Sequence, residues 1–177
     1  MHSDLQRRVS ASLRDVPDFP KAGIVFKDIT PLLADPPLMA EVIRAMAAPF
    51  LDAGVTHVVG VESRGFLFGM PLALHLGAAF APARKPGKLP WKTVRESFAL
   101  EYGEDALELH TDAVSKTSRV LIVDDVLATG GTAAAAVRLV RGLGADVVGA
   151  TFLSELQFLQ GRSQLDGTTV ASVLAIA

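Results

Sequence analysis

Two adjacent acids and a glycine-rich turn follow a short apolar run in the second half of the chain. Residues 120–132 read VLIVDDVLATGGT, and an Ala/Val/Leu-rich stretch comes next. The apolar run is typical of a buried strand, and the later stretch is typical of a helix. The first N–H groups of a helix favour an anion, and glycines let the backbone approach a phosphate closely. The pattern therefore predicts a phosphate site, in which Asp124 and Asp125 accept hydrogen bonds from two ribose hydroxyls.

The turn that would hold the 5′-phosphate is called the phosphate loop. It consists of Ala128, Thr129, Gly130, Gly131 and Thr132. No lysine follows the glycines, so the loop is not a P-loop of the GxxxxGK[ST] kind. Each half of the pattern has an ordinary alternative, since acids can cap the next element and glycines can form a tight turn. The two halves in this order are much more specific than either alone.

A second anion site is predicted at residues 60–66, GVESRGF, which follow an apolar run and start a helix. The helix start offers N–H groups, and Arg64 offers a forked guanidinium for phosphate oxygens. A surface arginine is the ordinary alternative. Basic residues also gather at Arg84, Lys85, Lys88, Lys92 and Arg95. A solvated loop is the default for such a cluster, but its position beside a predicted strand end favours a pyrophosphate site.

Length and composition restrict the class of protein. With 177 residues, the chain is expected to form a single domain, 1–177, with a real core. It has no apolar run of about 18 residues to span a membrane, and its N-terminus lacks the apolar core of a secretion signal. The absence of cysteine excludes disulfides and thiolate chemistry. The net charge of −2 argues against a general nucleic-acid binder. We expect a cytoplasmic protein.

Alternating apolar runs and helical patterns predict an α/β fold with a mostly parallel sheet flanked by helices. Strands are expected at 55–61, 79–84, 119–124, 147–153 and 169–176. Helices are expected near the N-terminus, with Ser3 as its N-cap, and at 36–51, 65–76 and 131–143. Pro49 predicts an early end or a kink in the second helix. Ligands on such sheets bind at the carboxyl ends of the strands, where every motif above lies.

Two segments do not fit the strand–helix alternation. Residues 15–35 are punctuated by Pro and Gly and are expected to form a compact loop region, the hood. Residues 86–118 are too long for an ordinary connection and are expected to form a lid. Within the lid, SFALEY and ALELH around Gly103 predict a two-stranded flap.

Five segments in order, FPKAGIVFKDITPLL, ESRGFLFG, RKPGKLP, LEYG and VLIVDDVLATGGT, resemble the adenine phosphoribosyltransferase family, within the type I phosphoribosyltransferases. The resemblance covers about residues 19–165. It implies the type I fold, with a small hood and a flexible lid loop, a cis peptide between Glu62 and Ser63, and a homodimer. It further implies transfer of 5-phosphoribosyl from phosphoribosyl pyrophosphate to N9 of adenine, a purine-salvage reaction that gives AMP and pyrophosphate. Mg²⁺ would be held mainly by the substrate and water, with no direct protein ligand.

The matching motifs imply a role for each site residue. The base site would contain Val25, Phe26, Lys27 and Leu156. Glu62, Ser63, Arg64, Arg84 and Lys88 would lie on the pyrophosphate side. Glu101 would be the acid near the purine, and Arg64 would assist the leaving group. Core packing remains an alternative for Leu156, and ordering of the flap remains one for Glu101. Many family members have Arg where Lys27 stands. The tryptophan at position 91 is a second departure from the family pattern, and it has no physical explanation.

Two other functions stay open at this point. One is a phosphoribosyltransferase for another purine, although the GIVFKD segment resembles the adenine type. The other is a regulatory domain that senses phosphoribosyl pyrophosphate. Such a regulator needs a DNA-reading element, and the 18 residues before Phe19 have room for one short helix and no helix-turn-helix.

Overall fold

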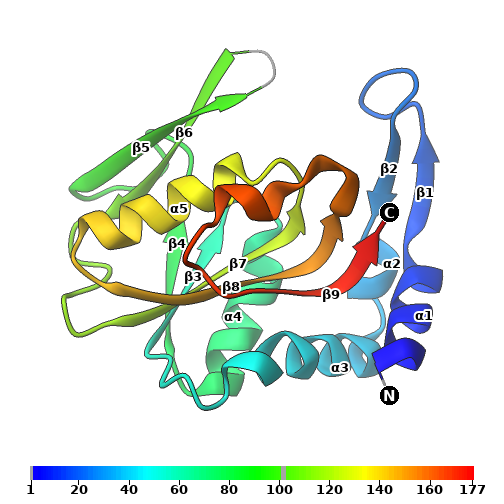
Figure 1. Cartoon of the computed structure of the whole chain (residues 1–177), viewed down its shortest axis with the longest axis horizontal. Coiled ribbons are helices and arrows are strands. Elements are labelled where there is room, and N and C mark those ends of the chain that lie inside the picture. Colours follow the sequence, from blue (N-terminus) through cyan, green and yellow to red (C-terminus); the bar gives the residue numbers. More distant parts are fainter. Residues whose placement is uncertain (1, 101–102) are drawn as a thin grey trace.

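A five-stranded sheet in the order β4-β3-β7-β8-β9 forms the centre of the computed structural model, which describes residues 2–100 and 103–177 (Figure 1). Its strands are β3 (His57–Val61), β4 (Ala79–Ala83), β7 (Arg119–Leu127), β8 (Asp146–Leu156) and β9 (Val170–Ile176). Neighbouring strands are parallel throughout. Because both faces of such a sheet are covered, its strands are near-continuous apolar runs, as the sequence predicts.

Helices cover both faces of the sheet. α3 (Pro36–Ala47) and α4 (Gly65–Leu76) lie on one face, and α5 (Gly131–Gly142) lies on the other (Figure 1). Successive residues of β7 point to opposite faces, so Leu121 and Val123 pack in the core under α3 and α4. Val120 and Ile122 pack in the core under α5. The layered α/β architecture expected from the sequence is confirmed.

Several boundaries differ from the expected ones, including the following three. α1 spans His2–Ser12, so Ser3 lies inside the helix and is not its N-cap. The α-helical part of α3 ends at Ala47 and a 3₁₀ turn, η1 (Ala48–Phe50), follows, which confirms the early end expected from Pro49. β7 continues to Leu127 because its pairing with β8 extends to Leu127 and Glu155. Asp125 therefore lies within the strand, as Asp124 does, and not after it.

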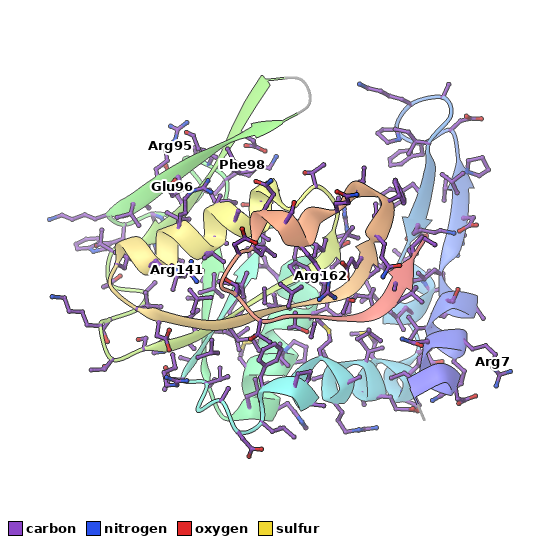
Figure 2. The ribbon with its side chains drawn as sticks, in the orientation of Figure 1. Arg7, Arg95, Glu96, Phe98, Arg141 and Arg162 are labelled. Atoms are coloured by element: carbon purple, nitrogen blue, oxygen red, sulfur yellow. The ribbon has the colours of Figure 1, made fainter. Side chains whose placement is uncertain are left out.

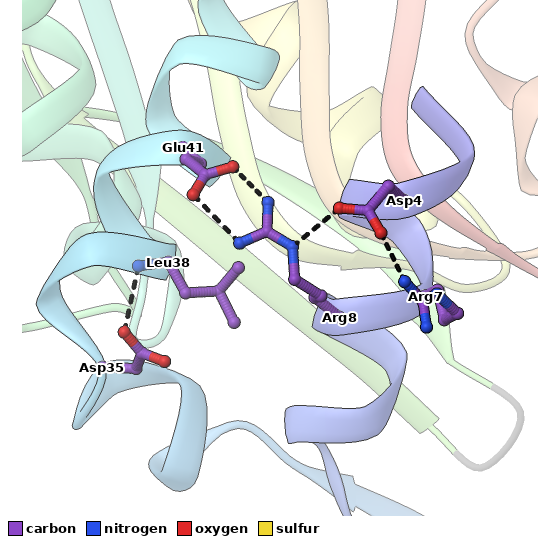
Figure 3. Close-up of polar contacts among 6 residues, drawn as sticks. All are labelled: Asp4, Arg7, Arg8, Asp35, Leu38 and Glu41. Atoms are coloured by element: carbon purple, nitrogen blue, oxygen red, sulfur yellow. Dashed lines mark hydrogen bonds and ion pairs between the residues drawn. The ribbon is translucent and has the colours of Figure 1, made fainter. Parts of the chain in front are cut away.

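Charged contacts join α1 to α3 (Figure 3). The Arg8 guanidinium binds the Glu41 carboxylate of α3 and, through Nε, Asp4 Oδ2 at 3.1 Å. Asp35 caps α3 by accepting a hydrogen bond from the Leu38 N–H at 3.0 Å, as its position before Pro36 predicts. Each of these groups is at least partly exposed, so we assign them a minor stabilising role.

The expectation of a loop region at residues 15–35 is wrong. β1 (Arg14–Pro17) and β2 (Val25–Asp28) form an antiparallel hairpin, and the short helix α2 (Thr30–Leu33) follows. The turn-forming residues lie in the connection between the strands, where Asp18 has a φ of 57° and its carboxylate accepts from the Gly23 N–H at 2.7 Å. The turn-forming residues thus form the connection of a hairpin, and the strands on either side of it pair with each other.

The predicted flap is present as β5 (Thr93–Leu100) and β6 (Gly103–His110), paired antiparallel. Phe98, Leu107 and Leu109 are buried in the same core cluster as α5. Arg138 of α5 also bonds Glu96 of β5 through Nε and Oε2 at 3.1 Å. The described inner part of the expected lid is therefore a packed wall against α5 (Figure 1).

Two short 3₁₀ turns, η2 (Gln157–Leu159) and η3 (Gly161–Gln164), connect β8 to β9. Within the described residues, no helix is long and apolar enough to cross a bilayer.

Candidate functional site

A cavity of about 210 Å³ lies where β3 and β7 end. It is lined by Glu62, Ser63, Arg64, Lys85, Phe98, Asp105, Leu107, Asp124, Asp125 and Thr132. The turn after β3 and the acids of β7 thus meet in one space, as expected for neighbouring parallel strands. The sequence analysis did not assign Lys85, Phe98, Asp105 or Leu107 to the site. Lys85 stood in the basic cluster, whereas the other three belong to the flap and gave no local signal.

The phosphate loop lines a second, adjoining pocket of about 60 Å³. Asp124 and Thr132 line both spaces, so the two adjoin each other along β7 and the start of α5. Gly130 is the N-cap of α5 with a φ of 87°, a conformation that favours glycine. No described side chain caps this helix, so the N–H groups of its first turn are available to an anion. Gly131 is its first residue.

The turn after β3 is packed directly on the acids of β7. A Cβ on Gly65, the first residue of α4, would lie 2.8 Å from the Val123 carbonyl oxygen and 3.0 Å from Asp124 Oδ1. A side chain at residue 65 would therefore push α4 away from the acids. The peptide between Glu62 and Ser63 is cis, as the family resemblance implies.

Arg64 joins three parts of the site. Its Nε donates to Asp125 Oδ2, and its guanidinium lies 5.5 Å from the centroid of the Phe26 ring in the hood. The Asp125 side chain is 6% exposed, whereas that of Arg64 is 45% exposed. The arginine thus compensates a buried carboxylate and still reaches the cavity, and the cation–π contact brings the hood against the sheet.

The two acids of β7 differ in their environment. Loss of solvent raises the pKa of Asp124 well above its usual range, and the negative charge of Asp125 raises it further. The Asp125 N–H donates to Asp124 Oδ1 at 2.8 Å and partly offsets this effect. The charge of Asp124 is therefore costly in the folded protein and is best satisfied by donors from a ligand.

Glu62 organises the basic side of the cavity. It accepts from Arg84 Nε at 3.1 Å and from the Lys85 N–H at 2.9 Å. Burial opposes the charge of Glu62, but these two donors outweigh it and lower the pKa of the carboxyl. Arg84 therefore supports Glu62 and does not itself line the cavity, and Lys88 accepts from Arg84 Nη1 through its backbone oxygen.

Lys85 is the one described residue of the basic cluster at 84–95 that lines the cavity. Its Nζ lies 2.9 Å from Asp105 Oδ2 on β6, and this ammonium is the main cause of the lowered pKa of Asp105. The pair connects the flap to the basic turn after β4. Since the Lys85 side chain is 56% exposed, it can exchange Asp105 for a phosphate oxygen.

The expected base residues lie on β2 and at the end of β8, and among them Phe26 contacts a residue of the cavity, Arg64, whereas Lys27 lines a separate pocket with the end of β9. Phe26 is on β2, packs edge-on against Phe19 with ring centroids 5.2 Å apart, and faces Arg64. Val25 is 54% exposed, and β2 pairs only with β1 among the described strands, so one edge of β2 is free. Lys27 Nζ is paired with Asp15 Oδ1 at 2.6 Å within the hood. Leu156 is half-buried at the end of β8, and Glu101 lies outside the described residues.

Comparison with known proteins identifies relatives over most of the chain. The family model for the phosphoribosyl transferase domain matches residues 28–157. The adenine phosphoribosyltransferase of Myxococcus xanthus is 60% identical over 166 residues, which are 94% of this chain and 90% of that protein. The family model thus spans four of the five strands of the sheet, β3, β4, β7 and β8, and both expected phosphate motifs.

Solved structures agree with this relationship. The adenine phosphoribosyltransferase of Rhodothermus marinus is 51% identical with a TM-score of 0.94, covering 98% of this chain and 99% of that one. The Saccharomyces cerevisiae enzyme is 40% identical with a TM-score of 0.91, covering 97% and 99%. That structure contains adenine and a dideoxy-imino-altritol bisphosphate. The expected type I phosphoribosyltransferase fold is therefore confirmed.

Proposed function

The chain belongs to the adenine phosphoribosyltransferase family, and we propose that its cavity transfers 5-phosphoribosyl from phosphoribosyl pyrophosphate to N9 of adenine. The products are AMP and pyrophosphate, as in purine salvage. The observation that carries the proposal is that two adjoining pockets, which share Asp124 and Thr132, bring together the Glu62–Arg64 turn, the Asp124–Asp125 pair and the phosphate loop. Together the two pockets can hold a sugar phosphate at one end and a pyrophosphate at the other.

The substrate is held from both ends in this proposal. The N–H groups of the phosphate loop and the first turn of α5 bind the 5′-phosphate. Asp124 and Asp125 accept from the ribose hydroxyls, which satisfies the costly charge of Asp124. Arg64 and Lys85 face the pyrophosphate, and Glu62 and Ser63 form the turn below it. Arg84 and the Lys88 backbone keep Glu62 in position.

Adenine binds between the hood and the end of β8. Phe26, which already faces Arg64, and Leu156 cover the base, and the free edge of β2 offers backbone donors and acceptors at Val25 and Lys27. A carbonyl accepts from N6 of adenine and an N–H donates to N1. Hypoxanthine has the opposite polarity at both atoms and would leave buried groups unpaired, so discrimination can reach about 10⁴–10⁵.

The reaction breaks the bond from the ribose C1′ to pyrophosphate and forms the bond from C1′ to N9. Positive charge develops on the ribose in the transition state, as in other glycosyl transfers. Arg64 and Lys85 stabilise the negative charge that leaves with pyrophosphate. Adenine must lose its N9 proton or be held as the reactive tautomer that carries this proton on N7. Glu101 is proposed to share the N7 proton and to take it up as the C1′–N9 bond forms. The hood and the flap limit water around the ribosyl cation.

Mg²⁺ fits this cavity as a substrate-bound ion. Mg²⁺ usually keeps several waters and binds substrate phosphates. Asp124 and Asp125 line the same cavity, where they are assigned to the ribose hydroxyls, so the diphosphate and water would hold the ion. Among the described residues, no group of three or more acids and histidines forms a protein-only metal site. When bound, the ion would neutralise charge on the diphosphate.

A homodimer in the cytoplasm completes the proposal. One observation that supports a dimer is an apolar stripe on α4, where Leu67, Met70 and Leu74 are 45%, 48% and 70% exposed. Sedimentation at micromolar concentration should give about twice 18.7 kDa.

One assay tests the activity. The protein is supplied with phosphoribosyl pyrophosphate, Mg²⁺ and adenine, hypoxanthine, guanine, xanthine or orotate in parallel. Adenine should be strongly preferred, and comparable kcat/KM values for adenine and hypoxanthine would refute the base assignment. Arg64→Lys should lower kcat because a lysine cannot keep the bond to Asp125 and also reach the leaving group in a forked geometry. Arg7→Lys, on exposed α1 far from the cavity, is the matched control and should leave kcat unchanged.

A further inference from the structure

The η3 turn packs backbone to backbone on the phosphate loop. A Cβ on Gly161 would lie 2.2 Å from the Ala128 carbonyl oxygen, and a Cβ on Gly130 would lie 2.3 Å from the Gly161 carbonyl oxygen. Neither residue has space for a side chain. Leu165, just after the turn, is buried in the core cluster that contains Ala133 and Ala134 of α5. The position of the phosphate loop therefore depends on the position of residues 161–164.

The η3 turn is in turn attached to the sheet by Arg162 (labelled in Figure 2). Arg162 Nε lies 2.6 Å from Glu155 Oε1, and Nη2 lies 2.7 Å from Oε2, which is a bidentate pair. Arg162 Nη1 also donates to the Val170 carbonyl at 2.9 Å, and Ser172 donates to Glu155 Oε2 at 2.9 Å. The pair thus joins the turn to both β8 and β9.

Glu155 stands at the site-bearing end of the sheet. It lies opposite Leu127, the last residue before the phosphate loop, and directly precedes Leu156. The Glu155 side chain is 5% exposed, so its charge needs the guanidinium, and Arg162 is the main cause of its lowered pKa. An ion pair with one buried partner thus lies next to the strand end that leads into the loop, and neither of its residues lines the cavity or the phosphate-loop pocket.

We infer that Arg162 and Glu155 are positioning residues for the 5′-phosphate of the ribosyl substrate, acting through Gly161 on Ala128 and Gly130. The inference rests on the proposed function, because it assigns the phosphate loop to that phosphate. Loosening the pair lets the η3 turn withdraw, and the loop N–H groups then lose their fixed positions. A misplacement of about 1 Å can cost on the order of 10²-fold. Adenine is assigned to the hood and Leu156, away from the phosphate loop, so its binding should depend on this contact much less than phosphate binding does.

The test compares Arg162→Lys, Arg162→Met and Glu155→Gln with wild type in the full-length protein. Lysine keeps the charge but donates from a single point, so Arg162→Lys should lie between wild type and Arg162→Met. Arg141→Lys is the matched control (Figure 2). Arg141 Nη2 donates to Thr168 Oγ1 at 3.2 Å. Arg141 therefore also contacts the connection between β8 and β9, but at a residue after the η3 turn.

Two affinities separate positioning from general damage. Calorimetry with ribose 5-phosphate alone should show a dissociation constant raised about tenfold or more in Arg162→Met, with KM for phosphoribosyl pyrophosphate raised in parallel. KM for adenine should stay within about twofold. Arg141→Lys should change neither value.

Unchanged ribose 5-phosphate affinity in all three variants, or equal loss for both substrates, would overturn the inference. Circular dichroism checks folding, and if Arg162→Met does not fold, Arg162→Lys and Glu155→Gln carry the same test. Failure of wild type to use adenine would instead overturn the proposed function, since ribose 5-phosphate binding is measured without the base.

Discussion

Substitution of Gly130 by alanine tests the geometry of the phosphate loop. Gly130 has a φ of 87°, and its Cβ would lie 2.3 Å from the Gly161 carbonyl oxygen. A left-handed conformation costs a non-glycine residue roughly 1–2 kcal/mol. A relaxed carbon–oxygen contact is about 3.3 Å, so the loop and the η3 turn must separate by about 1 Å. Such overpacking typically costs about 1–3 kcal/mol more.

The free energy of unfolding should therefore fall by about 2–5 kcal/mol in Gly130→Ala. For a chain of this size that lowers Tm by roughly 4–20 °C in a thermal melt. The same shift of about 1 Å displaces the N–H groups from the phosphate, so KM for phosphoribosyl pyrophosphate should rise up to about 10²-fold.

Gly142→Ala is the control, since it changes a glycine at the other end of the same helix. Apart from its chain neighbours and the backbone of its own helix, no described heavy atom lies within 4 Å of where its Cβ would sit, and its φ is not in the left-handed range. Alanine should stabilise the helix there by about 0.5–1 kcal/mol and leave KM unchanged. If Gly130→Ala has the same Tm and the same KM for phosphoribosyl pyrophosphate as Gly142→Ala, the described packing of the phosphate loop is wrong.

Three further results are expected. Asp124→Asn should raise Tm at neutral pH and lower kcat/KM roughly 10–100-fold by weakening a charged hydrogen bond to ribose. Because folding raises the pKa of Asp124, the wild-type protein loses stability as the pH rises from 3.8 through the raised pKa. The gain in Tm of Asp124→Asn should therefore disappear below pH 3.8. A variant Tm below that of wild type at pH 7 would contradict this prediction. Phe98→Ala should destabilise the protein by about 3–5 kcal/mol because Phe98 is a core residue, whereas an effect below about 1 kcal/mol would mean that the flap is not packed. Glu101→Gln should lower kcat by about 10²–10⁴ with little change in KM, and wild-type pre-steady-state chemistry in Glu101→Leu would assign Glu101 a structural role.

Local patterns were sufficient to predict the sheet, its flanking helices and the two anion motifs. Apolar runs of β3, β7 and β8 and the Gly and Pro signals beside them act over a few residues, so they can be read from the chain directly. Parallel strands also share an edge for their carboxyl ends, which is why Arg64 and Asp125 could be expected together although they are 61 residues apart. The hood was misread because the same Pro and Gly residues fit a loop and a hairpin turn.

Tertiary structure alone decided the remaining features, since each depends on a partner from a distant segment. The length of β7 is set by pairing with β8, and it moves Asp125 into the strand. Lys85 enters the site through Asp105 on the flap, and Phe26 enters through its contact with Arg64. Neither position 130 nor position 161 can carry a side chain, because the backbones of the phosphate loop and the η3 turn are in contact there. A sequence shows that a glycine is present, but only packing shows which backbone occupies the space where its side chain would be.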